Sequence, residues 1–412
     1  MINSIFILNG SGDVIFEKHY RGLISRAICD IFWVQVMKAS NPNDVKPVMQ
    51  SSKFYLINIH YKDLWFLAVV ERDVNPLLVV EFLYRVGDIF RDYFENVTES
   101  ILKNNFVIVY QLLEELMDNG MPFNTEPNQL KAMITPPSFY GGVMASMTGK
   151  KGVSSSVPTG SMSNTPWRRV GVKYTANEVY FDIIEELDAI VDANGLLVSS
   201  EVNGSIQSTC HLSGMPQLTM IFRNPRILDD VSFHPCVLLS SWEQSKILSF
   251  VPPDGNYKLM SYRVRSNVQP PIYVKPQINF SQGVGRVTVT VGTKVAANKN
   301  VENVVVTIPW GKTTSSCNLT ASFGKAQYDE QSKTLIWTIG RMPSDRTVSL
   351  SGSVHLVSGE KEVYPSIQAS FKVLLMSSSG LKVESLAVKN VNYKPYKGVR
   401  AITKSGTFTI RT

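Results

Sequence analysis

The side chains best suited to a chemical task lie in one short segment, residues 179–187. The alternation of apolar and polar residues there predicts a β-strand, in which successive side chains point to opposite faces. Tyr180 and Asp182 would share one face, with Val179 and Phe181 on the other. A carboxylate can accept a hydrogen bond from a phenol, and an aromatic ring can pack against one. The pair therefore suits binding of a tyrosine side chain; a buried structural acid or a strand-end cap is the competing interpretation of Asp182.

Residue patterns for metal binding and catalysis are missing. The five histidines form no His-x-x-x-His pair and the four cysteines no Cys-x-x-Cys, and His234 beside Cys236 lacks further ligands. There is no phosphate-binding Gly-x-x-x-x-Gly-Lys loop and no Gly-x-Ser-x-Gly turn. Residues 283–285 (Gly-Val-Gly) lack the third glycine and the helix of a nucleotide fingerprint. We therefore expect no enzyme activity, no metal and no cofactor.

The first 134 residues predict an α+β domain with helices against an antiparallel sheet. Pro76 suits a first helical turn and Gly120 suits a helix stop. The expected elements are strands 2–8 and 14–18 in a hairpin, a helix over 23–38, a loop over 39–52, strands 54–60 and 64–70, and helices over 76–94 and 100–119.

Residues 135–166 differ in composition from both flanking regions. Of these 32 positions, 20 are Gly, Ser, Thr or Pro, and none is acidic. Such a segment buries too little apolar surface to offset its ordering entropy, so we expect a flexible linker. Lys150-Lys151 and Ser154-Ser155-Ser156 could bind lipid or accept phosphate, but a solvated tether is the simpler interpretation.

From residue 167 to 412 the pattern is all-β. Short alternating runs separated by Gly, Pro, Asn and Asp suggest a large β-sandwich, or two sandwich-like halves joined end to end. The expected strands are 179–187, 205–212, 218–222, 246–250, 257–264, 287–291, 303–308, 334–339, 366–371 and 408–411.

Charge is unevenly divided along the chain. The formal net charge is +7 and the pI about 9.0. Residues 1–166 hold 14 basic and 16 acidic side chains, whereas residues 167–412 hold 27 and 18. The basic excess could attract anionic lipid headgroups, at about 1 kcal/mol per well-placed side chain, or be a solvated surface. A nucleic-acid-binding protein is a further class that the pI suggests, although the basic residues are dispersed and no matching motif occurs.

The composition, 44% hydrophobic and 18% charged, is typical of a soluble protein. The N-terminus lacks the basic segment and long apolar run of a signal peptide. No stretch reaches the roughly 18 apolar residues of a membrane-spanning helix. Four cysteines in 412 residues fit a reducing compartment. We expect a cytoplasmic protein whose contact with membranes is peripheral.

Two segments, 167–185 and 248–263, carry a specific resemblance, together with Leu212-Ser213-Gly214-Met215-Pro216 between them. They resemble the signatures of the medium (mu) chains of clathrin-adaptor-type complexes. Residues 117–120 with Phe123, and residues 393–400, favour the branch of this family that belongs to adaptor protein complex 3.

The resemblance covers essentially the whole chain and implies its domain organisation. An α+β longin-like assembly domain would occupy residues 1–134, followed by the linker. An all-β mu homology domain, an elongated β-sandwich with two subdomains, would occupy residues 167–412.

The resemblance also implies a function for the second domain, which would bind Tyr-x-x-apolar sorting signals in cytosolic tails of membrane cargo. The extended signal would add to a strand edge, which is β-augmentation, and insert two side chains into pockets. Tyr180, Asp182, Thr209 and Arg400 would form the tyrosine pocket. The pocket for the apolar fourth residue would be lined by Val179, Phe181, Val383, Leu386 and Val399.

Two positions depart from the family pattern. Gly398 stands where several relatives have a tryptophan, two residues before the pocket arginine. Thr209 stands where they have a lysine. We therefore expect a tyrosine pocket that is more open and less basic than theirs.

The family further implies a heterotetramer with two large subunits and one small (sigma) subunit, in which the longin-like domain buries its outer face against a large subunit. It implies peripheral attachment to Golgi and endosomal membranes and transport vesicles, with phosphoinositide lipids as a further partner, and traffic to lysosome- or vacuole-like organelles. The alternative within this class is a mu chain of another adaptor complex or the related coatomer subunit. No nucleic-acid partner is expected.

Overall fold

The computed structural model describes residues 1–39, 41–51, 53–71, 74–134, 136–137, 165–169, 171–265, 268–281, 283–296, 299–343, 347–357 and 364–412. The chain divides into two compact units, Met1–Arg169 and Val170–Thr412, each of which is described by itself. The expected linker, with Lys150-Lys151 and Ser154-Ser155-Ser156, lies outside the described residues except for positions 136, 137, 165 and 166.

The first unit is built on a five-stranded antiparallel sheet with the strand order β2-β1-β5-β4-β3. Its strands are β1 (Ile2–Leu8), β2 (Val14–His19), β3 (Val48–Ser51), β4 (Phe54–Tyr61) and β5 (Leu64–Val70). All seven residues of β1 and of β5 are buried, because helices cover both faces of the sheet.

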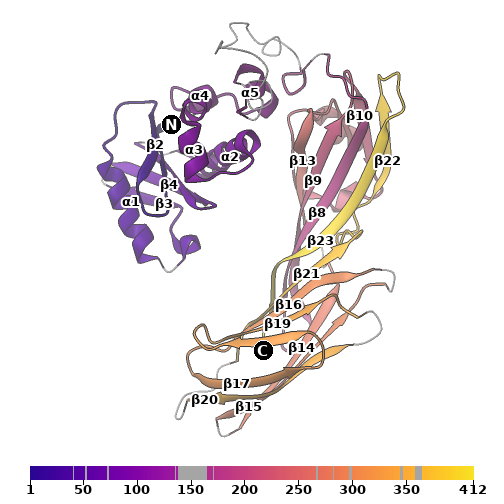
Figure 1. The fold of residues 1–412 in the computed structure, drawn as a ribbon. Coiled ribbons are helices and arrows are strands. Elements are labelled where there is room, and N and C mark those ends of the chain that lie inside the picture. The colour runs from indigo at the N-terminus through magenta and orange to yellow at the C-terminus, as the bar shows by residue number, and fades with distance from the viewer. Residues whose placement is uncertain are drawn as a thin grey trace, which may run out of the picture. The chain divides into compact units, whose positions relative to one another are not determined.

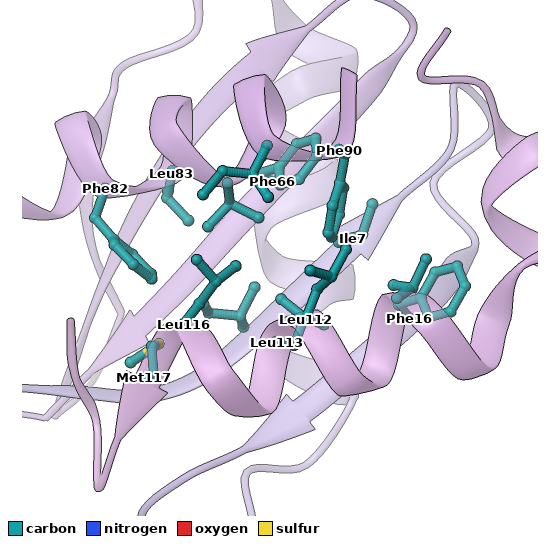
Figure 2. Packing of buried hydrophobic residues seen from close by; sticks show 14 of the residues in the cluster. Ile7, Phe16, Phe66, Phe82, Leu83, Phe90, Leu112, Leu113, Leu116 and Met117 are labelled. Atoms are coloured by element: carbon teal, nitrogen blue, oxygen red, sulfur yellow. The ribbon is translucent and has the colours of Figure 1, made fainter. Parts of the chain in front are cut away.

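Two apolar clusters lie on opposite faces of this sheet. Phe6, Phe32 and Trp65 belong to the cluster under α1 (Ala27–Lys38). Ile7 and Phe66 belong to the other cluster, which lies against the remaining helices (Figure 2). Those helices are α2 (Pro76–Phe94), α3 (Glu99–Asn104), α4 (Phe106–Leu116) and α5 (Pro127–Met133). Neighbours in a strand point to opposite faces, so one strand supplies both cores.

Most sequence-based expectations for this unit are confirmed, and two are wrong. The hairpin, the strand pair β4–β5 and the helix from Pro76 to Phe94 form as expected. The expected loop over 39–52 instead contains a 3₁₀ turn (Pro42–Asp44) and strand β3, which pairs with β4.

The expected helix over 100–119 is interrupted at Asn105, whose backbone leaves the helical region and whose side-chain amide donates to the carbonyl of Ile101. It ends at Leu116, where β6 (Met117–Asp118) pairs with β7 (Met121–Pro122). Helix α5 was not anticipated, because its seven residues are too few for a periodic signal.

The second unit is almost entirely β-structure. Helix α7 (Leu239–Ser245) and a 3₁₀ turn (Pro225–Ile227) are its described helical segments. Its strands are β8 (Glu178–Val191), β9 (Leu197–His211), β10 (Gln217–Phe222), β11 (Asp229–Phe233), β12 (Ile247–Phe250), β13 (Gly255–Val264), β14 (Ile272–Ser281), β15 (Val284–Thr293), β16 (Val301–Pro309), β17 (Thr314–Ala321), β18 (Lys325–Asp329), β19 (Thr334–Gly340), β20 (Val348–Leu356), β21 (Ile367–Leu374), β22 (Val383–Lys389) and β23 (Tyr396–Ile410).

A nine-stranded sheet, in the order β11-β13-β9-β8-β23-β21-β16-β19-β18, runs through this unit (Figure 1). The separate sheet β12-β10-β22 accompanies one half, and the sheet β14-β15-β20-β17 the other. Among the described strand pairs of this unit, β8 with β23 is the parallel one. The expected architecture, an α+β domain followed by an all-β domain with two subdomains, is confirmed.

All ten expected strand runs lie within or overlap observed strands, but several strands were missed. Strand β22 has little apolar alternation and lies at the edge of its sheet, and β14 contains Pro276. The expected run 408–411 covers only the C-terminal end of β23, which begins at Tyr396 and ends at Ile410. None of the described helices is long and apolar enough to cross a bilayer.

Gly120 offers a test of the packing of the first unit. Its φ is +81°, its carbonyl accepts a hydrogen bond from the amide of Ile2, and an added Cβ would lie 2.3 Å from the Ile2 carbonyl oxygen. Gly120→Ala should therefore lower the free energy of unfolding by about 2–4 kcal/mol. Gly22→Ala is the matched control, since its φ is +71° with open space around it, and should cost about 1 kcal/mol. Calorimetric unfolding of the two variants tests this; equal losses would contradict the clash.

Candidate functional site

The parallel pairing of β8 and β23 brings together residues more than 200 positions apart in the sequence. Asp182 lies opposite Arg400, and Tyr180 lies opposite Gly398. On its other side β8 pairs with β9, so Thr209 lies opposite Tyr180. The expected residues of the tyrosine pocket are thus side by side on three neighbouring strands.

Alternation along β8 separates the two sets of side chains. Val179, Phe181 and Ile183 are buried, whereas Tyr180 is exposed and Asp182 is partly exposed. The expected division between the faces is therefore confirmed. Asp182 stands inside the strand and keeps an accessible side chain, which does not favour a buried structural acid or a strand-end cap.

Asp182 and Arg400 form a bidentate ion pair. The Arg400 Nε donates to Asp182 Oδ1, and the Nη2 donates to Oδ2 at 2.7 Å. The side chains are 26% and 62% exposed, respectively. Hydrogen bonding to the carboxylate raises the pKa of Arg400 above its ordinary value. The site thus presents an acceptor and a planar cation to solvent, both of which can contact a phenol ring.

Tyr180 covers the backbone at Gly398. A Cβ added to Gly398 would lie 2.6 Å from Cδ1 of Tyr180, so only glycine leaves room for this ring. The ring also packs against Tyr396, with centroids 5.6 Å apart. The Tyr180 hydroxyl donates to Glu178 Oε2 at 2.9 Å, which raises the pKa of Tyr180. The space gained from a glycine at position 398 is therefore filled by Tyr180, which differs from the expectation of a more open pocket.

Thr209 is an uncharged residue close to the ion pair. Its Oγ1 donates to Asn256 Oδ1 at 2.6 Å, across the pairing of β9 with β13. Among the expected pocket residues, Arg400 is the one that carries positive charge.

The five residues expected around the apolar pocket are not equally accessible. Val383 and Leu386 on β22 are partly exposed, and Val399 is 42% exposed. Val179 and Phe181 are fully buried at 0% exposure, and Phe181 packs edge-on against Phe250 of β12. The inward face of β8 is covered by the three-stranded sheet, so these two side chains support the apolar surface from beneath rather than line it.

A strand edge runs past both groups of residues. Residues 396–400 of β23 pair with β8 alone among the described strands, because the pairing with β21 begins at Ile402 and the Ala401 carbonyl accepts from the amide of Met376. Across from this edge, β22 pairs only with β10 in the described part of the chain. The Lys397 Nζ bridges the two strands by donating to the carbonyl oxygen of Leu386 at 2.6 Å. The edge can accept an extended peptide through main-chain hydrogen bonds.

Comparison with known proteins follows the same division of the chain. The family model described as "Adaptor complexes medium subunit family" matches residues 165–412, and the model described as "Clathrin adaptor complex small chain" matches residues 1–136. The chain belongs to the adaptor complexes medium subunit family, a class of non-enzymatic trafficking subunits, as the sequence motifs predicted.

Relatives of known name cover the chain from end to end. The AP-3 complex subunit mu of Dictyostelium discoideum is 51% identical and the AP-3 complex subunit mu-1 of Homo sapiens 46%, each over 100% of both chains. An AP-1 complex subunit mu of Diplobatis ommata is 46% identical over the same span. A homology model of the full-length AP-3 complex in an intermediate open conformation matches with a TM-score of 0.64 at 16% identity, over 100% of both chains, which supports the fold. The chain is thus the medium subunit of an adaptor complex.

The contact between Tyr180 and Gly398 can be tested by a double-mutant cycle. Gly398→Ala should displace the Tyr180 ring and lower the free energy of unfolding by about 1 kcal/mol. In a Tyr180→Ala background the same change should cost almost nothing, because the obstructing ring is gone. Urea unfolding of the four chains measures the coupling; equal costs in both backgrounds would contradict it.

Proposed function

We propose that the second unit binds Tyr-x-x-apolar sorting signals in cytosolic tails of membrane cargo by β-augmentation on the edge formed by residues 396–400. The observation that carries this proposal is the accessible Asp182–Arg400 ion pair directly beside that unpaired edge. The partly exposed residues Val383, Leu386 and Val399 supply apolar surface nearby.

The tyrosine of the signal would enter beside the ion pair. Asp182 would accept the hydrogen bond of the phenol, while the Arg400 guanidinium lies against the ring. An exposed ion pair is worth only about 0–1 kcal/mol, so the side chains can rearrange around a ligand. Tyr180 would form the aromatic wall, and Thr209 a neutral polar margin.

The spacing of the signal matches a site divided between two strands. The tyrosine and the apolar residue are three positions apart, which in an extended chain corresponds to about 10 Å. The tyrosine would lie over β8 and β23, and the apolar side chain against β22 and Val399. Because Val179 and Phe181 are buried beneath that surface, the pocket for the apolar residue would be shallow. We expect an affinity on the order of micromolar or weaker, because two small pockets must offset the ordering of a flexible peptide.

The first unit is proposed as the assembly domain that binds a large subunit within a heterotetramer, completed by a second large subunit and a sigma subunit. Support comes from the outer side of α1, where Ile31, Val34 and Met37 are exposed at helical spacing. We retain 1–134, 135–166 and 167–412 as the proposed assembly domain, linker and signal-binding domain.

We place the protein in the cytoplasm, peripherally attached to Golgi and endosomal membranes and vesicles, with traffic directed to lysosome- or vacuole-like organelles. No catalytic activity is proposed. The basic excess of the second unit would contribute by attracting phosphoinositide-containing membranes. Co-sedimentation with liposomes that contain or lack phosphoinositide tests this part, and binding that ignores both lipid and salt would contradict it.

A place in a different adaptor complex is the second candidate, since a relative named as an AP-1 subunit is as similar as the human AP-3 subunit. The large subunits recovered with the tagged full chain, identified by mass spectrometry, decide between the complexes.

Removing the acceptor of the phenol should strongly weaken signal recognition. Asp182→Ala in the full chain deletes a charge-assisted hydrogen bond worth about 1.5–3 kcal/mol, so affinity for a Tyr-x-x-Leu peptide should fall by about 10- to 100-fold. Isothermal titration calorimetry measures the loss.

Glu186→Ala is the matched control for this change. Glu186 lies on the same face of β8 and pairs with Lys404 at 2.5 Å, but its partner strand is covered there by β21. Its affinity should equal that of the wild type. An unchanged affinity in Asp182→Ala would contradict the proposed site.

Phosphorylation of the signal tyrosine should also prevent binding. The phosphate adds about −1.5 to −2 charges, which would face the carboxylate of Asp182. A phosphorylated peptide is expected to show no measurable heat at concentrations that saturate the unmodified peptide. Tighter binding of the phosphopeptide would instead indicate a site dominated by Arg400.

A further inference from the structure

A buried acid lies three residues beyond Asp182 on the same strand. Glu185 is 0% exposed and points to the inward face of β8, away from the proposed tyrosine pocket. No basic side chain forms an ion pair with it among the described residues. A buried carboxylate is costly unless hydrogen bonds satisfy its oxygens, so its partners define what it does.

Neutral donors from two directions satisfy Glu185. Its Oε1 accepts from the Tyr262 hydroxyl at 2.9 Å, from Ser377 Oγ at 2.7 Å and from Ser379 Oγ. Its Oε2 accepts from the backbone amide of Ser379 at 3.0 Å. Burial and the neighbouring Glu185 raise the pKa of Tyr262, which keeps the phenol protonated and able to donate. The carboxylate therefore accepts hydrogen bonds both from β13 and from the segment that follows β21, and so connects the two.

This arrangement is built into the sheet. Tyr262, Gly204, Glu185 and Thr403 are register partners in one row across β13, β9, β8 and β23. A Cβ at Gly204 would lie 2.1 Å from Cζ of Tyr262, so the tyrosine passes over a bare backbone to reach Glu185. A glycine inside a strand often marks such a close approach.

The segment held by Glu185 connects β21 to β22. Residues 376–381 leave the nine-stranded sheet and enter the strand that carries Val383 and Leu386. Thr403, also fully buried, fixes the same segment: its Oγ1 donates to the carbonyl of Met376 and accepts from the amide of Ser378, each at 3.0 Å. The two strands that carry Asp182 and Arg400 thus hold the connection to β22 three residues further along.

We propose that Glu185 is a positioning residue that, with Thr403, sets the distance between the tyrosine half of the binding site on β8 and β23 and the apolar half on β22. The inference rests on the proposed recognition of Tyr-x-x-apolar signals. A signal of fixed spacing can use both halves together only if β22 is held in place, which is the same requirement of pre-organisation that other two-point sites have.

The carboxylate is suited to this role because it only accepts hydrogen bonds. A glutamine of nearly equal size would present an NH₂ group to hydroxyl and amide donors, leaving at least one of them without an acceptor. Glu185→Gln should therefore release residues 376–381 while changing little volume.

The experiment measures how much the tyrosine and the leucine of the signal each contribute to the binding affinity. Full-length wild-type and Glu185→Gln chains are titrated with a Tyr-x-x-Leu peptide and with versions that carry alanine in place of the tyrosine or the leucine. In the wild type the leucine-to-alanine penalty should be about 10-fold. In Glu185→Gln it should shrink to less than about 3-fold, while the tyrosine-to-alanine penalty stays as in the wild type.

Glu186→Gln is the matched control, since it makes the same chemical change at the adjacent, exposed position of β8. It should keep both penalties. Ser377→Ala serves as a milder second variant, which removes one donor to Glu185 and should lower the leucine penalty in the same direction. It decides the question if Glu185→Gln does not fold.

An additional readout does not depend on peptide binding. The amides of Ser378 and Ser379 donate to Thr403 and Glu185, so their hydrogen exchange should be slow in the wild type and accelerated in Glu185→Gln. Unchanged exchange, or variants that weaken all peptides equally and keep both penalties, would overturn the positioning role. A wild-type chain with protected amides but no penalty for either alanine would contradict the proposed function instead.

Discussion

The site proposed for signal binding depends on the parallel main-chain pairing of β8 with β23. This ladder places Asp182 opposite Arg400 on the outer face and Glu185 opposite Thr403 on the inner face. Because side chains alternate, a slip of one residue in β23 would turn Arg400 inward and expose Thr403, and the same slip in β8 would turn Asp182 inward and expose Glu185. The register therefore fixes an accessible ion pair and its buried support at the same time. The edge of β23 that β21 leaves free lies beside this ion pair and is the proposed place of peptide pairing.

Local periodicity predicted the elements that carry strong local patterns. The alternation in residues 179–187 gave the two faces of β8, and Pro76 marked the start of α2. The prediction of a loop over residues 39–52 is wrong because β3 has only four residues and is stabilised by its pairing with β4. Similarly, the family motif pointed to Arg400, but only the fold reveals that residues 396–400 form a strand edge that pairs with no other described strand than β8. Pairing between distant segments does not change the alternation of apolar and polar residues in either segment, so periodicity cannot predict it.

Three features of the site needed side-chain packing to become visible. Val179 and Phe181 were assigned to a pocket, yet the sheet containing β12 covers them, which follows from being on the inward face of a sandwich strand. Gly398 was expected to open the site, but the free space is taken by Tyr180. Glu185 could have been noticed as an acid at an inward position between Ile183 and Leu187, and Gly204 as a glycine within a strand. Both are local conflicts that a structure must resolve with specific partners.

The parallel strand pair also has a consequence for biosynthesis. Strand β8 emerges from the ribosome more than 200 residues before β23, so their contacts have a very large sequence separation. Such contacts form slowly, since the intervening chain must first be ordered. Strand β8 therefore lacks its β23 neighbour for a time, while β9 already pairs with its other edge. Under the proposed function, a nascent subunit would engage cargo only once residues 396–410 are available, and until then the edge of β8 that later pairs with β23 is an unpaired strand edge prone to wrong pairing.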